Sequence, residues 1–192
     1  MKEHLTIEGL KKIIAIKASM NLGLSELLKT AFLNVTPIDL PLVPAGGYQR
    51  ALSTKIEDMN WLAGFTSAEG CFMIKVASSS SHRLGFQVKL VFALTQHIRD
   101  ELLMRSLASY FDCGLFRERK GGMAGDYLVE KFPDLTDKIV PFFHKYPILG
   151  IKSQDFEDFC KVVELMKNKA HLTEEGLNQI RLIKAGMNSG RQ

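Results

Sequence analysis

Two segments of the chain alternate between apolar and polar side chains, which predicts β-strands with one buried face. In residues 71–77 and again in residues 86–95, the even positions carry the apolar side chains. Two further strands are predicted over residues 115–120 and 126–131, joined by a loop at residues 121–125. Each strand therefore offers one apolar face, and the sheet that they form must lie on the rest of the domain by that face.

Elsewhere the apolar side chains recur at helical spacing. The predicted helices span residues 98–111, 135–146, 154–168 and 173–187. A shorter segment of apolar and small side chains, residues 61–68, ends at Gly70, directly before the first strand. The order is helix, two strands, helix, two strands, then helices. This order predicts an α+β domain with a four-stranded sheet and helices on one side of it.

The two ends of the chain repeat each other. Residues 4–23 and 171–190 are identical at 13 of 20 positions. Both copies are predicted helices with an N-cap, an acid in the first turn and a C-terminal glycine: Thr6 and Thr173, Glu8 and Glu175, Gly23 and Gly190. The repeat predicts that the chain starts with the tail of one structural unit and then holds one whole unit. The alternative is one helix type used twice in a single domain.

The composition between the two copies defines three regions. Residues 1–35 form the helical tail, residues 36–58 form a linker that contains three prolines and Gly46-Gly47, and residues 59–192 form the complete unit. A proline- and glycine-containing segment of this kind favours an extended linker.

Composition and charge exclude several classes of protein. The 192 residues include 46% hydrophobic side chains, which excludes disorder as the main state. No apolar stretch approaches the length of a membrane helix, and no signal or transit peptide is recognisable, so we expect an intracellular protein without a membrane partner. The three cysteines form no CxxC pair, which argues against a disulfide framework or a zinc site. The net charge of +4 permits a nucleic-acid partner without arguing for one.

The polar face of the predicted sheet is more informative than the net charge. It carries side chains that bind phosphates or read base edges: Lys75, Gln87, Lys89, Thr95, Arg117, Arg119, Asp126 and Glu130. A curved antiparallel sheet can lie along the major groove of DNA, as a β-ribbon does. A solvated sheet face is the alternative, because antiparallel sheets commonly have one.

The sharpest local signal is LAGFTSAEG at residues 62–70. Its small side chains, which let two helix backbones approach closely, are Ala63, Gly64, Ser67 and Ala68. Glu69 stands at the carboxyl end of this helix, where the helix dipole disfavours an acid. A bound divalent cation would explain it, and a surface glutamate that happens to end a helix is the alternative.

Residues 62–70 resemble the motif of the LAGLIDADG homing endonucleases, with an acid in the penultimate place. The resemblance extends over about residues 60–192, whose element order is similar to the family's αββαββα domain with its four-stranded antiparallel DNA-binding saddle. The linker and residues 147–169 resemble the two-motif members found in fungal mitochondrial introns. The resemblance implies a site-specific endonuclease that recognises a long site in double-stranded DNA. It also implies that the protein is encoded in an intron and is mitochondrial.

The resemblance also implies site residues. Glu69, which takes the place of the family's aspartate, and the carbonyl of Ala68 would hold Mg²⁺, or Mn²⁺ or Ca²⁺ in its place. Gln96 would position water, and Lys152 would stabilise charge near the scissile phosphate. Residues 78–83 would form a mobile loop that follows the DNA. The implied DNA-binding residues are Lys75, Ser79, His82, Gln87, Lys89, Thr95, Arg117, Arg119, Asp126, Leu128 and Glu130.

The chain contains one such motif, and one motif supplies one acid. We therefore expect a homodimer on a palindromic or near-palindromic site, paired through Trp61, Ala63, Gly64, Ser67 and Ala68. Two alternatives remain open. One is a non-cleaving half-domain that binds DNA or RNA, or an intron maturase. The other is one half of a split two-motif enzyme.

Overall fold

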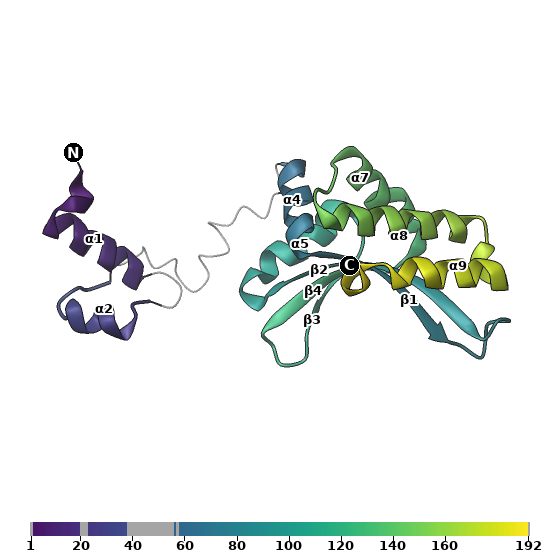
Figure 1. Cartoon of the computed structure of the whole chain (residues 1–192), viewed down its shortest axis with the longest axis horizontal. Helices are drawn as coiled ribbons and strands as arrows, with labels where there is room; N and C mark the ends of the chain where they lie inside the picture. The colour runs from purple at the N-terminus through teal and green to yellow at the C-terminus, as the bar shows by residue number, and fades with distance from the viewer. Residues whose placement is uncertain (1, 20–22, 38–55, 57, 192) are drawn as a thin grey trace. The chain divides into compact units, whose positions relative to one another are not determined.

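The computed structural model describes residues 2–19, 23–37, 56 and 58–191 (Figure 1). The chain divides into two compact units, Met1–Ala51 and Leu52–Gln192. Most of the predicted linker at residues 36–58 lies outside the described residues. Within the described part of the chain, no helix combines the length and the apolar character needed to cross a bilayer.

The first unit is helical. It contains the short 3₁₀ turn η1 (Glu3–Leu5), helix α1 (Ile7–Ala18) and helix α2 (Glu26–Ala31). Thr6 caps α1 as predicted, because its hydroxyl accepts a hydrogen bond of 3.0 Å from the backbone N–H of Gly9. The prediction that α1 continues to Gly23 is wrong. The helix ends at Ala18, and the Ser19 hydroxyl donates to the carbonyl of Ala15 in the last turn.

The second unit has the predicted order of elements. Its helices and turns are α4 (Met59–Glu69), η2 (Ile98–Asp100), α5 (Glu101–Phe111), α6 (Phe132–Asp134), the π-turn η3 (Leu135–Ile139), α7 (Val140–Lys145), α8 (Ile151–Lys167), η4 (Ala170–Leu172), α9 (Glu174–Ala185) and η5 (Asn188–Gly190). Its strands are β1 (Gly70–Ser78), β2 (Phe86–His97), β3 (Leu115–Glu118) and β4 (Ala124–Val129). Strand β3 is two residues shorter than predicted, and β4 has the predicted length but begins and ends two residues earlier.

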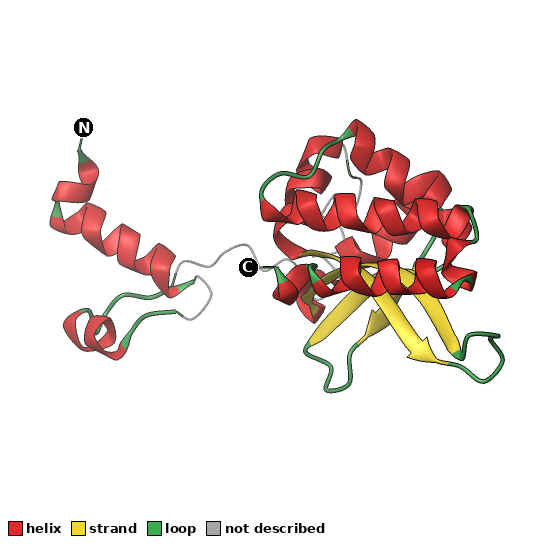
Figure 2. Cartoon of the chain, turned by 45° about the vertical axis from the view of Figure 1, so that its right-hand side comes forward, coloured by secondary structure: helices red, strands yellow, loops and turns green. Residues whose placement is uncertain are grey.

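The strands of the described region form one four-stranded antiparallel sheet in the order β1-β2-β4-β3. The helices cover one face of this sheet and leave the other face open (Figures 1 and 2). The even positions of β2 from Val88 to Leu94 are buried under the helices, as their alternation predicts. The predicted α+β fold is confirmed.

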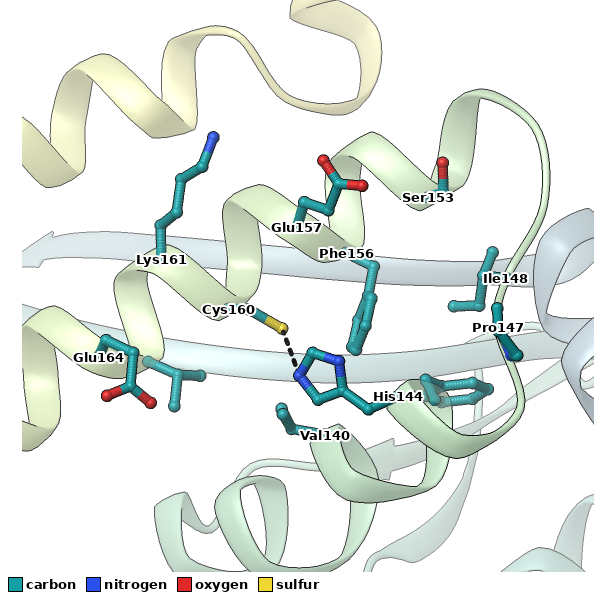
Figure 3. Close-up of a pocket in the computed structure, with 12 residues that line it drawn as sticks. Val140, His144, Pro147, Ile148, Ser153, Phe156, Glu157, Cys160, Lys161 and Glu164 are labelled. Atoms are coloured by element: carbon teal, nitrogen blue, oxygen red, sulfur yellow. Dashed lines mark hydrogen bonds between the residues drawn. The ribbon is translucent and has the colours of Figure 1, made fainter.

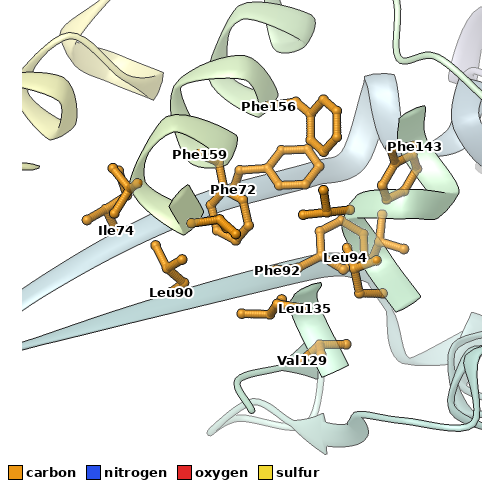
Figure 4. Packing of buried hydrophobic residues seen from close by; sticks show 14 of the residues in the cluster. Phe72, Ile74, Leu90, Phe92, Leu94, Val129, Leu135, Phe143, Phe156 and Phe159 are labelled. Carbon is orange, nitrogen blue, oxygen red and sulfur yellow. The ribbon is translucent and has the colours of Figure 1, made fainter. Parts of the chain in front are cut away.

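Phe72 of β1 is the centre of the core (Figure 4). Its side chain is fully buried, and its ring lies 5.1–5.8 Å from the rings of four other phenylalanines. These rings come from the neighbouring strand and from helices α7 and α8: Phe92, Phe143, Phe156 and Phe159. Such packing fixes β1, and with it the end of α4, against the helical layer.

Helix α9 begins as predicted and ends early. The Thr173 hydroxyl accepts from the N–H of Gly176 at 3.1 Å, which repeats the cap of α1. The helix stops at Ala185, two residues before the predicted end at residue 187, and Gly190 lies in η5 rather than at the end of the helix. The chain turns there because Asn188, with a positive φ of 53°, donates its side-chain amide to the carbonyl of Phe72 at 3.0 Å.

Candidate functional site

Helix α4 delivers Glu69 to the junction between the helical layer and the sheet. Asp58 caps the helix by accepting from the N–H of Asn60 at 2.8 Å, and the helix passes into β1 at Gly70. A Cβ at position 70 would stand 2.5 Å from the carbonyl oxygen of Thr66, so this abrupt junction requires glycine. Glu69 is exposed, and its carboxylate has no hydrogen-bond or ion-pair partner among the described residues.

The structure brings Lys152 to the same junction from a distant part of the sequence. Lys152 lies in the first turn of α8, and its Nζ donates to the carbonyl of Gly70 at 2.5 Å. The ammonium group therefore lies beside the residue that follows Glu69. Gln96 is near the end of β2, two residues beyond Leu94, which pairs with Gly70. The three predicted catalytic residues thus share one end of the sheet.

Sequence reasoning missed the groups that hold Lys152 in place. Asp155, one turn further along α8, is buried, and its carboxylate accepts from the backbone N–H of Asn188 and from Arg191 at 2.9 and 3.1 Å. Asn188 in turn binds the carbonyl of Phe72. This network fastens the start of α8 to the start of β1. The sequence hints at this network in one place only, where the acidic Asp155 precedes Phe156 on the face of α8 that is buried.

On the open face of the sheet, three predicted DNA-binding residues form a closed network. Arg119 donates to both oxygens of Asp126 at 3.0 and 2.8 Å and to the Thr95 hydroxyl at 3.0 Å. Thr95 also donates to Asp126 at 2.7 Å. Burial favours the protonated Asp126 carboxyl, but the hydrogen bonds from Arg119 and Thr95 and the nearby arginine charges outweigh it and lower its pKa. Asp126 therefore orients Arg119 and is not a free acceptor.

The remaining predicted DNA-binding residues of the sheet also lie on its open face. Lys75 of β1 pairs directly with Lys89 of β2, and both are exposed. Between the charged positions on this face lie two apolar residues of β2, Val91 and Ala93, which are buried. The other members of this face are Gln87 and Leu128, which are half-buried, and Arg117 and Glu130, which are exposed, Glu130 directly after β4.

The turn between β1 and β2 is held by its own hydrogen bonds. The Ser79 hydroxyl lies 2.8 Å from Nδ1 of His82, and the Ser79 N–H donates to the carbonyl of Gly85 at 2.8 Å. Arg83 also donates to the carbonyl of Leu172 in η4 at 3.2 Å. The two predicted DNA-binding residues of this turn are therefore engaged with each other, and the turn is attached to the helical layer.

The predicted pairing surface of α4 needs correction. Ala63 is buried in its own domain, and Ser67 is half-buried, donates to the carbonyl of Ala63 and accepts from the N–H of Leu149 at 3.3 Å. Small residues occur on both sides of this helix, so the sequence could not tell which side is free. The exposed residues on the free side are Trp61, Gly64 and Ala68, and the half-buried Phe65 at its edge also packs against the core.

The free side of α4 has apolar neighbours that the sequence did not reveal. The rings of Trp61 and Phe65 stack 5.2 Å apart. A Cβ at Gly64 would meet no atom within 4 Å. Leu149 and Ile151 are 75% and 61% exposed, and the hydrogen bond to Ser67 places the first of them next to α4. Together they form an uncovered apolar surface around a small-residue centre.

A cavity of about 640 Å³ lies elsewhere, between α7 and α8 (Figure 3). It contains Cys160, whose sulfur lies 4.0 Å from Nε2 of His144. Burial raises the pKa of this thiol to about 12, helped by the charges of Glu164 and Glu157. Burial therefore holds this thiol in its protonated, poorly nucleophilic form.

Comparison with known proteins gives consistent matches. The profile of the LAGLIDADG endonuclease family matches residues 62–163. "Probable intron-encoded endonuclease 3" of Neurospora crassa is 42% identical over 182 residues, which are 95% of this chain and 33% of that protein. The "Uncharacterized 50.9 kDa protein in ND4 intron 1" of Podospora anserina is 35% identical over 132 residues, which are 68% of this chain and 28% of that protein.

A solved structure is similar over the whole chain. The I-SmaMI LAGLIDADG homing endonuclease bound to cleaved DNA has a TM-score of 0.89 and 47% identity, and the match covers 100% of this chain and 61% of that one. The same endonuclease has been solved on an uncleaved DNA target in the presence of calcium ions. This chain spans about a third of the curated relatives named above and about three fifths of the solved one.

Proposed function

This chain belongs to the LAGLIDADG endonuclease family, and from that membership we propose that it is a site-specific endonuclease unit that hydrolyses phosphodiester bonds in double-stranded DNA. It reads a long site with the open face of its sheet, and it cleaves when a second unit pairs with α4. The names of the fungal relatives, including a protein of an ND4 intron, support an intron-encoded, mitochondrial origin.

The observation that carries the proposal is the charge of the open sheet face. Lys75 and Lys89 stand directly opposite each other on neighbouring strands, where like charges destabilise a sheet. Neither has an acidic partner within 4 Å among the described residues. Backbone phosphates would neutralise both ammonium groups. Gln87 and Arg117 on the same face offer donors and acceptors of the kind that address base edges.

The residues at the α4–β1 junction suit a hard divalent cation, which we take to be Mg²⁺. The Glu69 carboxylate and the carbonyl of Ala68 are oxygen donors, the ligand type that Mg²⁺ and Ca²⁺ prefer. No group of three or more His, Cys, Asp or Glu side chains in the described residues can hold a metal ion. Mg²⁺ is usually held by one or two carboxylates together with waters and substrate phosphates, and a second unit would supply the second carboxylate. When bound, the cation activates water and stabilises the leaving oxygen.

Two side chains of this chain act around that cation. Lys152, held at the carbonyl of Gly70, places a positive charge where negative charge develops on the scissile phosphate. Gln96, at the same end of the sheet, orients the attacking water through its side-chain amide. Asp155 and Asn188 are positioning residues, because they fix the turn of α8 from which Lys152 projects.

We take the second unit to be another copy of this chain, paired through the uncovered surface of α4. The repeat favours a second candidate, a non-identical unit of the same fold. Leu10, Ile13 and Ile16 of α1 are 40–48% exposed. Their equivalents in α9, Leu177, Ile180 and Ile183, pack into the core of the second unit. Helix α1 thus carries the apolar face of a final helix, and in the described part of the chain this face is largely exposed.

Substituting Gly64 by leucine tests pairing through α4. The free space around this position means that the Gly64→Leu chain should fold normally. The added side chain would keep two α4 helices from close approach, so we expect self-association to weaken by about 5- to 150-fold, the equivalent of the 1–3 kcal/mol typical of overpacking. Sedimentation equilibrium measures it, with Gly64→Ala as the conservative control. Equal association of the leucine variant and the wild type would exclude α4 as the contact.

The function itself is tested with a pool of duplexes of randomised sequence. We expect the full chain to select duplexes that share a long consensus, and to cut the selected duplexes with Mg²⁺ but not with EDTA. Selective binding without cleavage would instead favour a non-cleaving DNA- or RNA-binding unit. A chain that selects no duplex would contradict the proposed function.

A further inference from the structure

A trough runs along the outer edge of β1, between this strand and α9. It consists of two adjoining cavities of about 440 and 360 Å³, which share Lys184 and Ala185 of α9. Lys75 and Ser189 line the first cavity, and Arg181 and Phe86 line the second. Because β1 is an edge strand of the sheet, the trough opens at the margin of the domain.

The trough is positively charged, and its nearest acid is Glu174, which lines the next cavity along together with Arg181. Lys75, Lys184 and Arg181 come from two separate elements, and no acidic side chain lines either cavity. Among the described residues, none of the three forms an ion pair. The guanidinium of Arg181 lies 4.4 Å from the centre of the Phe86 ring, which holds it at the wall of the trough. Three unneutralised cations in one depression attract an anion.

The trough is continuous with the proposed DNA-binding face. Lys75 belongs to both, because it lines the trough and pairs with Lys89 on the open face. A band of cations therefore runs from β2 across β1 to α9. The hydroxyl of Ser189, which is exposed beside Lys184, adds a hydrogen-bond donor suited to a phosphate oxygen.

We propose that this trough binds the phosphodiester backbone of the same DNA duplex and extends the interface beyond the sheet onto α9. This inference rests on the function proposed above. The contact contributes affinity and orientation and carries no sequence information, because an ammonium group on a flexible stem meets phosphates as a point charge. Lys184 lies outside the sheet and lines both cavities, so its substitution tests the trough separately from the sheet face.

The test is the salt dependence of DNA affinity for the full chain carrying Lys184→Gln. Dissociation constants for random-sequence duplexes are measured over a series of NaCl concentrations. Loss of one phosphate contact should lower the slope of log affinity against log salt by about 1, equally for unrelated sequences. Lys184→Arg, which keeps the charge, should retain the wild-type slope. Lys145→Gln is the matched control, because it removes the same charge from α7, in the helical layer (Figure 1).

The outcomes separate this inference from the proposed function. If the wild type binds duplexes and Lys184→Gln has the slope of Lys145→Gln, the trough does not contact DNA, although the sheet face still does. If Lys184→Arg behaves as Lys184→Gln, the contact is not electrostatic and the inference is wrong. If the wild type binds no duplex, the proposed function fails and the trough fails with it.

Discussion

Substituting Glu69 by glutamine is expected to abolish Mg²⁺-dependent cleavage and to leave DNA affinity unchanged or slightly higher. Glutamine keeps the volume of the side chain but replaces a carboxylate with a neutral amide, a poor ligand for a hard cation. Losing about 4 kcal/mol of the charge stabilisation that a bound cation provides corresponds to a rate reduction of about 10³-fold. Binding is spared because a carboxylate contributes no attraction to the phosphates of DNA.

The measurement compares cleavage rates and dissociation constants on a duplex that the wild type has selected. Glu157→Gln is the matched control, since it makes the same change on an exposed residue of α8 that lines the cavity beside α7. The control should cleave at the wild-type rate. Cleavage by the Glu69→Gln chain at more than about a tenth of the wild-type rate would show that Glu69 is not the metal ligand.

Substituting Phe72 by alanine is expected to produce the largest loss of stability of any single core change. Its ring is fully buried and contacts rings from β2, α7 and α8, so no single neighbour can move in to fill the space. Removing a buried phenylalanine ring costs about 3–5 kcal/mol. That loss is a large share of the 5–15 kcal/mol by which domains are typically stable.

Urea unfolding followed by circular dichroism measures this loss as a lower midpoint at an unchanged slope. Leu182→Ala on α9 serves as the comparison, because Leu182 is 77% exposed and its substitution should change the free energy of unfolding by less than about 0.5 kcal/mol. A Phe72→Ala chain as stable as the Leu182→Ala chain would contradict the central role of this ring in the core.

The strand pattern and the motif predicted the fold well for identifiable reasons. Alternation has a strict period of two, so the buried set from Val88 to Leu94 and the open face with Lys75 and Lys89 followed from parity alone. The junction at Gly70 was predicted because the helix period stops and the strand period starts at one glycine. Thr6 and Thr173 were identified as caps because capping is a local interaction.

What the sequence could not predict depends on contacts between distant residues. Asn188 binds Phe72 across 116 positions of sequence, and no local pattern announces such a hydrogen bond. Arg119 and Asp126 were both predicted to bind DNA, and their contact with each other could not be predicted because it forms only when two strands pair. The exposed Leu149 lies in an irregular segment without periodicity, so only its hydrogen bond to Ser67 places it beside α4.

The central claim is that the open face of the sheet binds duplex DNA, and the salt dependence of affinity for the double variant Lys75→Gln/Lys89→Gln tests it most directly. Each substitution removes one phosphate contact, so the slope of log affinity against log salt should fall by about 2 relative to the wild type. The control is Lys161→Gln/Lys167→Gln, which removes the same charge from α8 in the helical layer. If the double variant on the sheet has the same slope and affinity as this control, the open face of the sheet does not bind duplex DNA.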